Sequence, residues 1–213
     1  MIIESCCTTL EEALAAQQRG ADRIELCADL SVGGVTPPRD LIREVVSALT
    51  ISVNILIRCR VKSGMADSFT FTDFVYGEED IAQMIEDIKY CKEVGAAGIV
   101  VGALTPEGAI DVAAMRQLIA AARPLPVTFH RAFDVCTQDP FVALDQVISL
   151  GCTRLLTSGQ ASTAWDGRGT LALLVRRAGP RLIILVGKGV TPANIVDLAK
   201  ETGAVEFHGT RIP

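Results

Sequence analysis

Short apolar runs alternate with longer amphipathic stretches along nearly the whole chain. Eight of these runs have the length and residue types of buried β-strands, and the stretches between them show helical periodicity. The predicted strands are Ile2–Ser5, Arg23–Leu26, Ser52–Ile57, Gly98–Gly102, Pro126–His130, Arg154–Thr157, Leu182–Val186 and Val205–Phe207. The predicted helices are Thr9–Arg19, Asp80–Val94, Val112–Ala122, Phe141–Leu150, Thr170–Ala178 and Pro192–Glu201.

The alternation of strand and helix predicts parallel strand pairing, and eight such strands favour a closed (β/α)8 TIM barrel. We expect a single barrel domain over residues 1–213, with residues 62–76 forming a long surface loop between the third and fourth strands. The chain stops soon after the eighth predicted strand, so its final helix should be short or missing. An apolar flank left uncovered there would favour a homo-oligomer.

The composition narrows the class of protein. Hydrophobic residues make up 49% of the chain and aromatic residues only 5%, which is typical of aliphatic parallel strands covered by helices. The net charge is −5 and no basic stripe is visible, so nucleic acid is not an expected partner. The N-terminus lacks a signal-peptide pattern and no apolar run approaches the roughly 20 residues that span a bilayer. We therefore expect a cytoplasmic protein without a membrane partner, whose seven cysteines are reduced thiols.

The stretch VTFHRAFD, at residues 127–134, gathers the densest chemistry at one predicted strand end. His130, Arg131 and Asp134 bring a base, a permanent cation and an acid within five positions. The carboxyl ends of barrel strands form the functional face, so these residues are candidate catalytic groups. His130 would serve as general acid or base, because its ordinary pKa lies near working pH. The alternative is a structural Arg131–Asp134 pair beside an ordinary histidine.

Other strand ends are polar as well, whereas the predicted strand interiors are almost wholly apolar. Glu4 and Glu25 need partners if they are buried, and Arg58 and Arg60 are the expected ones because the strand period of two places both on one side. Either carboxylate is a candidate second base, and the two arginines would hold an anionic ligand. His208 adds a further candidate ligand-binding group on the last strand. A purely stabilising ion-pair network is the alternative.

A glycine-containing segment, GKGVTPAN at residues 187–194, follows the seventh predicted strand. Gly187 and Gly189 would let backbone amides approach an anion at the start of the next helix. Ser158 and Gly159 end the neighbouring strand and would complete this site. The alternative is a tight turn between strand and helix.

Cysteines follow three consecutive strands, at Cys6, Cys27 and Cys59. Adjacent strands lie about 4.8 Å apart, so the Cys6 and Cys27 thiols are close enough to share one soft ion. Two thiolates suit Cu(I), which prefers sulfur. The alternative is that these residues pack as small hydrophobes.

Six segments together resemble the CutC copper homeostasis family: ADRIELC (21–27), GGVTPP (33–38), IRCR (57–60), TFHRAFD (128–134), RLLTSG (154–159) and EFH (206–208). The resemblance implies a cytosolic, oligomeric (β/α)8 barrel with a role in copper tolerance. It also implies a Cu(I) site on the cysteines that match Cys6 and Cys27.

The chain departs from the family pattern in four places. Cys59 stands where the family usually has proline, residues 62–74 replace a glycine-rich stretch, and Lys188 interrupts a run of three glycines. The family also continues further past the final histidine segment.

Two functional hypotheses follow. The first is a copper homeostasis protein that binds Cu(I) through Cys6 and Cys27. The alternative is a TIM-barrel enzyme that acts on a small phosphate- or carboxylate-bearing metabolite through His130 and the Arg/Glu cluster.

Overall fold

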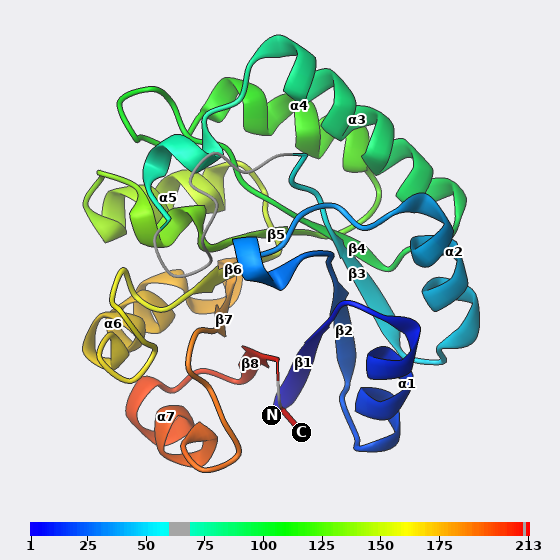
Figure 1. Cartoon of the computed structure of the whole chain (residues 1–213). Helices are drawn as coiled ribbons and strands as arrows, with labels where there is room; N and C mark the ends of the chain where they lie inside the picture. Colours follow the sequence, from blue (N-terminus) through cyan, green and yellow to red (C-terminus); the bar gives the residue numbers. More distant parts are fainter. Residues whose placement is uncertain (60–68, 211) are drawn as a thin grey trace.

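The strands close into a barrel in which all neighbours are parallel and follow chain order (Figure 1). The computed structural model describes residues 1–59, 69–210 and 212–213. Its strands are β1 (Ile2–Cys7), β2 (Arg23–Leu26), β3 (Ser52–Leu56), β4 (Gly98–Val101), β5 (Val127–Phe129), β6 (Arg154–Thr157), β7 (Ile183–Val186) and β8 (Glu206–Gly209). Pairing of β1 with β8 closes the barrel, which confirms the predicted (β/α)8 fold. Arg60 and residues 62–68 of the predicted loop lie outside the described residues.

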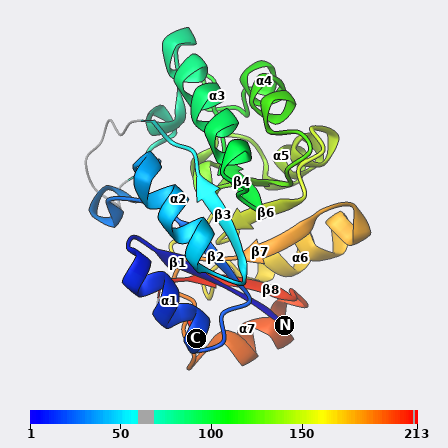
Figure 2. The ribbon, with the colours of Figure 1, turned by 90° about the vertical axis from the view of Figure 1, so that its right-hand side faces the viewer.

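Seven α-helices surround the barrel within the described part of the chain (Figure 1). They are α1 (Leu10–Gln18), α2 (Arg39–Ala48), α3 (Glu78–Glu93), α4 (Val112–Ala122), α5 (Pro140–Ser149), α6 (Arg168–Ala178) and α7 (Ile195–Thr202). Figure 2 shows α1 and α2 on the outer side of the first three strands, where α1 contacts β1 and β2 and α2 contacts β3. None of the described helices is both long and apolar enough to cross a bilayer.

Helix α2 is absent from the elements that the hydrophobic pattern predicts. It begins directly after Pro38, carries Asp40 in its first turn, and buries Ile42 and Val45 against the barrel. Proline at a helix start and an acid in the first turn are start signals, but the β-branched valines weaken helix propensity here. Burial of the apolar face therefore decides the structure of this segment.

The described part of the predicted surface loop packs onto the barrel instead of extending into solvent. Residues 71–74 form a 3-10 turn, in which Phe74 is buried and the Asp73 carboxylate accepts a hydrogen bond from the Thr70 amide at 2.9 Å. Phe69 lies against Gly33, where a Cβ atom would meet the phenyl ring at 1.7 Å. The expectation of a surface loop is therefore wrong for residues 69–76.

The chain beyond β8 folds back toward the first helix. No helix follows β8 in the described residues, as expected. Ile212 is buried, and Arg19, which follows α1, donates a hydrogen bond to the Pro213 carbonyl at 3.0 Å.

The barrel interior is more polar than the predicted apolar strand interiors. Arg23 bridges two carboxylates, because its Nε donates to Glu4 and its Nη2 donates to Glu206 at 2.7 Å. Arg154 donates to the same Glu206 oxygen at 2.8 Å, and Asn54 donates to Glu4 at 3.2 Å. Successive residues of a strand point to opposite faces of the sheet, and these side chains all lie on the face inside the barrel. There they form one connected layer in which the buried charges are paired. We call this set the ionic network.

Apolar packing occupies two separate regions. The larger cluster lies between the sheet and the helices. A small second cluster, made of Cys6, Cys27, Leu56 and Val100, is separate from it. It borders the cavity at the barrel mouth, which Cys6, Cys27 and Leu56 line.

Removal of Arg23 should destabilise the barrel strongly. We expect Arg23→Met to lower the free energy of unfolding by about 3–5 kcal/mol, because it leaves buried carboxylates short of a counter-charge. Urea unfolding at neutral pH measures this. Arg43→Met is the control, since Arg43 pairs with Asp40 on the surface and its loss should cost less than about 1 kcal/mol. Equal unfolding midpoints for the two variants would contradict a stabilising role for the ionic network.

Candidate functional site

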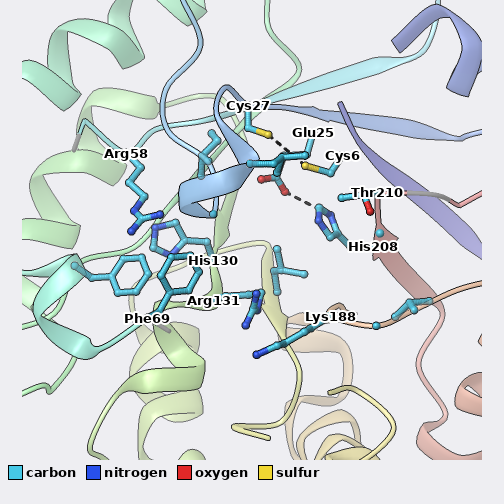
Figure 3. A pocket seen from close by; sticks show the side chains of 18 of the residues that line it. Cys6, Glu25, Cys27, Arg58, Phe69, His130, Arg131, Lys188, His208 and Thr210 are labelled. Atoms are coloured by element: carbon cyan, nitrogen blue, oxygen red, sulfur yellow. Dashed lines mark hydrogen bonds and ion pairs between the residues drawn. The ribbon is translucent and has the colours of Figure 1, made fainter. Parts of the chain in front are cut away.

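A cavity of about 390 Å³ opens where the strands end (Figure 3). It brings together eight residues predicted from strand ends and loops: Cys6, Glu25, Cys27, Arg58, His130, Arg131, Gly189 and His208. Glu4, Asp134, Ser158, Gly159 and Gly187 are not among the described residues that line it. Sequence reasoning missed Phe69 and Phe74, which also line it, and did not count Lys188 as a site residue.

Two thiols meet on one wall of the cavity. Cys6 lies on β1 and Cys27 directly follows β2, and their Sγ atoms are 3.3 Å apart (Figure 3). Hydrogen bonding to Cys27, burial and the nearby Glu25 charge raise the pKa of Cys6 well above its ordinary value. Cys59 instead donates to Asp80 at 3.7 Å and does not line the cavity. The thiol pair is therefore formed by Cys6 and Cys27 alone among these three cysteines.

Two carboxylates share one imidazole below the thiols. The Nδ1 atom of His208 lies 2.9 Å from Glu4 Oε1 and 3.5 Å from Glu25 Oε2. Burial acts to raise the pKa of Glu4, but His208 and Arg23 outweigh it and lower that pKa to about 2. Glu4 is thus ionised and can only accept, so His208 Nδ1 is the donor. Arg23 and His208, and not the predicted Arg58, are the charged partners of Glu4 within the described residues, whereas Arg60 lies outside them.

Glu25 differs from Glu4 because it lacks a comparable donor. Its Oε2 atom is buried and has no hydrogen-bond partner in the described part of the chain. Burial raises the pKa of Glu25 to about 7, with His208 opposing and Glu4 adding to the rise. Burial also acts to lower the pKa of His208, but the Glu25 and Glu4 charges raise it overall.

These three residues each offer one ligand atom within 4.8 Å of the others, a spacing that a metal ion also needs. In this structure Glu4 already accepts from Arg23, Asn54 and His208. The hydrogen-bonding capacity of Glu4 is therefore largely used by donors of the protein, whereas Glu25 Oε2 has none among the described residues.

Arg58 is buried at the opposite side of the cavity and is anchored through one nitrogen. Its Nη1 donates to the carbonyls of Val32 at 3.2 Å and Gly34 at 3.0 Å. Its Cζ atom lies 4.7 Å and 4.8 Å from the ring centroids of Phe69 and Phe74. Burial lowers the pKa of Arg58, yet an arginine of this kind stays charged. Nε and Nη2 have no hydrogen-bond partner among the described residues.

His130 is held as a neutral donor. Its Nδ1 accepts a hydrogen bond from the Ala132 amide at 3.2 Å, so the ring proton resides on Nε2. Burial and the charge of Arg58 lower the pKa of His130 to about 3. The expectation that it titrates near neutral pH is therefore wrong. Gly102 permits this placement, since a Cβ atom there would lie 2.6 Å from Nδ1.

Asp134 acts as a structural anchor. It accepts from Arg131 Nε at 3.0 Å, from Thr157 Oγ1 at 2.5 Å and from the Ser158 amide at 3.0 Å. Gly159 donates its amide to Thr157 Oγ1 at 2.9 Å. These contacts agree with the alternative in which Arg131 and Asp134 form a structural pair. Asp134 orients Arg131, which lines the cavity.

The predicted anion site after β7 is not built as expected. Helix α7 begins at Ile195, and the Thr191 amide already donates to Asn194 Oδ1 at 2.8 Å. Gly187 packs inside the barrel, where a Cβ atom would meet Leu156 at 2.5 Å. Lys188, with a positive φ of 73°, and Gly189 do line the cavity. The contribution of this segment is thus the Lys188 charge and not a helix N-terminus.

The sequence of this chain is similar to those of known proteins over nearly its whole length. A family model described as the CutC family matches residues 1–213. The chain belongs to the CutC family. A CutC family protein of Histophilus somni (strain 2336) is 46% identical over 208 residues, covering 98% of this chain and 81% of that relative. A CutC family protein of Parabacteroides distasonis is 47% identical, covering 97% of this chain and 81% of the relative.

Solved structures show the same relation. The crystal structure of the putative copper homeostasis protein CutC from Streptococcus agalactiae superposes with a TM-score of 0.91 at 35% identity, covering 100% of both chains. A structure described as QR15, an aldolase, gives a TM-score of 0.69 at 10% identity over 99% of this chain and 89% of that chain. The second likeness shows the barrel fold alone, whereas the first is a likeness within the CutC family.

The neutral state of His130 should make stability depend on pH. In the unfolded chain histidine takes up a proton near its ordinary pKa of 6.5, whereas folded His130 does so only near 3. The folded state is therefore disfavoured as pH falls below 6.5, by about 2 kcal/mol between pH 7 and pH 5. We expect His130→Gln to lose this part of the pH dependence in urea unfolding at pH 7, 6 and 5. Parallel profiles for the variant and the parent would contradict a depressed pKa.

Proposed function

We propose that this CutC family chain is a cytoplasmic copper homeostasis protein that binds Cu(I) through Cys6 and Cys27. The observation that carries the proposal is the 3.3 Å approach of the two Sγ atoms at the cavity wall. Sulfur is the ligand that Cu(I) prefers, and two ligands satisfy it. A reducing cytoplasm would keep both thiols available for the ion. The description of the Streptococcus agalactiae relative as a putative copper homeostasis protein is consistent with this role.

The charges around the thiols also support the proposal. Cu(I) with two thiolates carries one net negative charge, which a buried wall alone would not stabilise. Arg131 and Lys188 line the same cavity and supply positive charge. Glu25 works in the opposite direction, because its charge disfavours thiolate at Cys6. Bound Cu(I) would offset that repulsion with its own positive charge.

Cu(I) affinity should depend on both thiols of the pair. We expect Cys6→Ser and Cys27→Ser each to weaken Cu(I) binding by more than the roughly 10–100-fold that loss of an outer partner costs. A competition titration of the reduced protein against a colorimetric Cu(I) chelator measures the affinity.

Cys7→Ser is the matched control for that titration. Cys7 neighbours Cys6 on β1 but packs in the outer core, so its loss should leave Cu(I) affinity unchanged. Parental affinity in a protein that carries both Cys6→Ser and Cys27→Ser would disprove the proposed site.

A second candidate function is an enzyme that transfers a proton on a small phosphate- or carboxylate-bearing metabolite. One specific observation favours it. Glu25 lines the cavity, and its buried Oε2 has no hydrogen-bond partner in the described residues. A carboxylate without a donor, aimed at a cavity that also contains Arg131 and Lys188, has the arrangement of a general base beside an anion-binding region.

Deuterium exchange tests this second function. Small phosphate- and carboxylate-bearing metabolites with acidic C–H bonds are incubated with the protein in D2O, and loss of the C–H signal is followed by proton NMR. Glu25 would take the proton from carbon, and solvent would return deuterium to the same carbon. We expect Glu25→Gln to slow exchange by about 10²–10⁴-fold, with the exposed Glu86→Gln as control. Exchange that proceeds equally in Glu25→Gln would reject Glu25 as the base.

We further propose that the chain forms a homo-oligomer through the flank near β8. Val205 precedes β8 and is 61% exposed, and Val196 on α7 is 54% exposed. Exposed apolar side chains on the outer surface of a barrel favour association between copies. Light scattering coupled to size exclusion measures the mass in solution, and a monomeric mass at high concentration would contradict this part of the proposal.

A further inference from the structure

Three buried N–H donors at one side of the cavity lack a protein acceptor. They are Nε and Nη2 of Arg58 and Nε2 of His130, none of which has a hydrogen-bond partner within the described residues. Arg58 is 2% exposed and His130 is 4% exposed. Leaving a buried donor unpaired costs about 1–3 kcal/mol, and more when the group is charged. Such a cluster beside a cavity indicates an acceptor that arrives from outside.

The anchoring of Arg58 determines which of its edges is available. Nη1 is engaged by the carbonyls of Val32 and Gly34, which fix the guanidinium in place. Nε and Nη2 lie together on the remaining edge and form a two-pronged donor. This fork matches the two oxygens of a carboxylate, which it binds through two parallel hydrogen bonds.

His130 adds a third donor whose direction is fixed. The Ala132 amide occupies Nδ1, so Nε2 carries the proton. Its ring lies 5.0 Å from the ring of Phe74, which also contacts the Arg58 guanidinium. The two donor residues therefore share one aromatic neighbour and face the same cavity (Figure 3).

The surroundings strengthen an interaction with a singly charged anion. Phe69 and Phe74 keep water away from Arg58, and a charged hydrogen bond is stronger where the local dielectric is low. The nearby Tyr76 hydroxyl and, after it, the Asp73 carboxylate act to raise the pKa of Arg58, against the larger lowering by burial. Neither group makes a hydrogen bond with Nε or Nη2 of Arg58, and Asp73 accepts one from the Thr70 amide. The free edge of Arg58 is thus available to a ligand.

We propose that Arg58 and His130 form a subsite for the carboxylate of a small organic acid, with the Arg58 edge binding both oxygens and His130 Nε2 donating a third hydrogen bond. We call these two residues the carboxylate subsite. This proposal rests on the second candidate function and deepens it by naming the substrate class, and the subsite does not require bound Cu(I). The rest of the acid would extend through the cavity toward Glu25 and Lys188, which line it.

A carboxylate fits better than a phosphate for two reasons. Phosphate sites in barrels of this kind use backbone amides at a helix start, and here the Thr191 amide is taken and α7 begins only at Ile195. One arginine edge and one neutral imidazole also match a single negative charge and two oxygens, whereas phosphate brings a further oxygen and up to two charges.

The test is a binding titration of the reduced, metal-free protein at constant ionic strength. The probes are acetate, pyruvate, succinate and benzoate, with inorganic phosphate as the competing anion and acetamide as the uncharged analogue. We expect at least one carboxylate to bind saturably and acetamide not to bind. Phosphate that binds more tightly than every carboxylate, in an Arg58-dependent manner, would overturn the carboxylate assignment.

Variants separate this subsite from its surroundings. Arg58→Lys retains the charge but loses the fork, and should weaken carboxylate binding by about tenfold or more. His130→Phe should weaken it as well, whereas the exposed Arg43→Lys should not. Unchanged binding in both Arg58→Lys and His130→Phe would overturn the proposal.

Two further measurements keep the result unambiguous. Cys6→Ser and Cys27→Ser should bind the carboxylate like the parent, so failure of the copper site and failure of this subsite are distinguishable. In the unmodified protein, the Arg58 Nε–H NMR resonance should shift downfield when the carboxylate binds. Absence of that shift at saturation would contradict the subsite even if Arg58→Lys does not fold.

Discussion

Pairing of buried charge inside the barrel is the constraint on which the rest of this structure depends. Arg23 joins Glu4 on β1 to Glu206 on β8, and Arg154 reaches the same Glu206 from β6. These residues come from distant parts of the chain, so their pairing ties the closing strands into one register. A slip of one residue would turn the charges outward into the apolar core between sheet and helices, where they would be unpaired.

The same network sets the chemistry of the cavity above it. Glu4 is held ionised by His208 and Arg23, and His208 Nδ1 is the donor to it. Glu25 shares His208 only at 3.5 Å, so burial dominates and raises its pKa to about 7. The pKa values of Glu4 and Glu25 therefore shift in opposite directions, because Glu4 accepts hydrogen bonds from His208 and Arg23, whereas Glu25 Oε2 has no donor among the described residues.

Much of the fold was predictable, since strands buried on both faces and separated by helices leave a clear apolar pattern. A stabilising ion-pair network around Glu4 was one alternative that the sequence offered, but Arg23, Arg154 and Glu206 were not predicted as its members. The polar residues of RIELC and EFH recur at every second position and carry that signal. Their partners are fixed only by barrel closure, which brings His208 beside Glu4 across 204 positions. Strand ends located most of the cavity, but Phe69 and Phe74 come from a segment without strand or helix periodicity. The two rings pack against Arg58 only once the barrel has folded and its strand ends have come together.

The two binding proposals occupy different ends of one cavity and are coupled by charge. Cu(I) held by two thiolates and a carboxylate held by Arg58 would each bring a net negative charge into a space of about 390 Å³. Arg131 and Lys188 lie among the lining residues and can lower the energy of either ligand. If both ligands bind, repulsion in this poorly solvated volume makes each weaken the other, and thermodynamic linkage requires the two effects to be equal. The affinity for copper and the affinity for an organic acid would then each depend on the same two cavity-lining cations, Arg131 and Lys188.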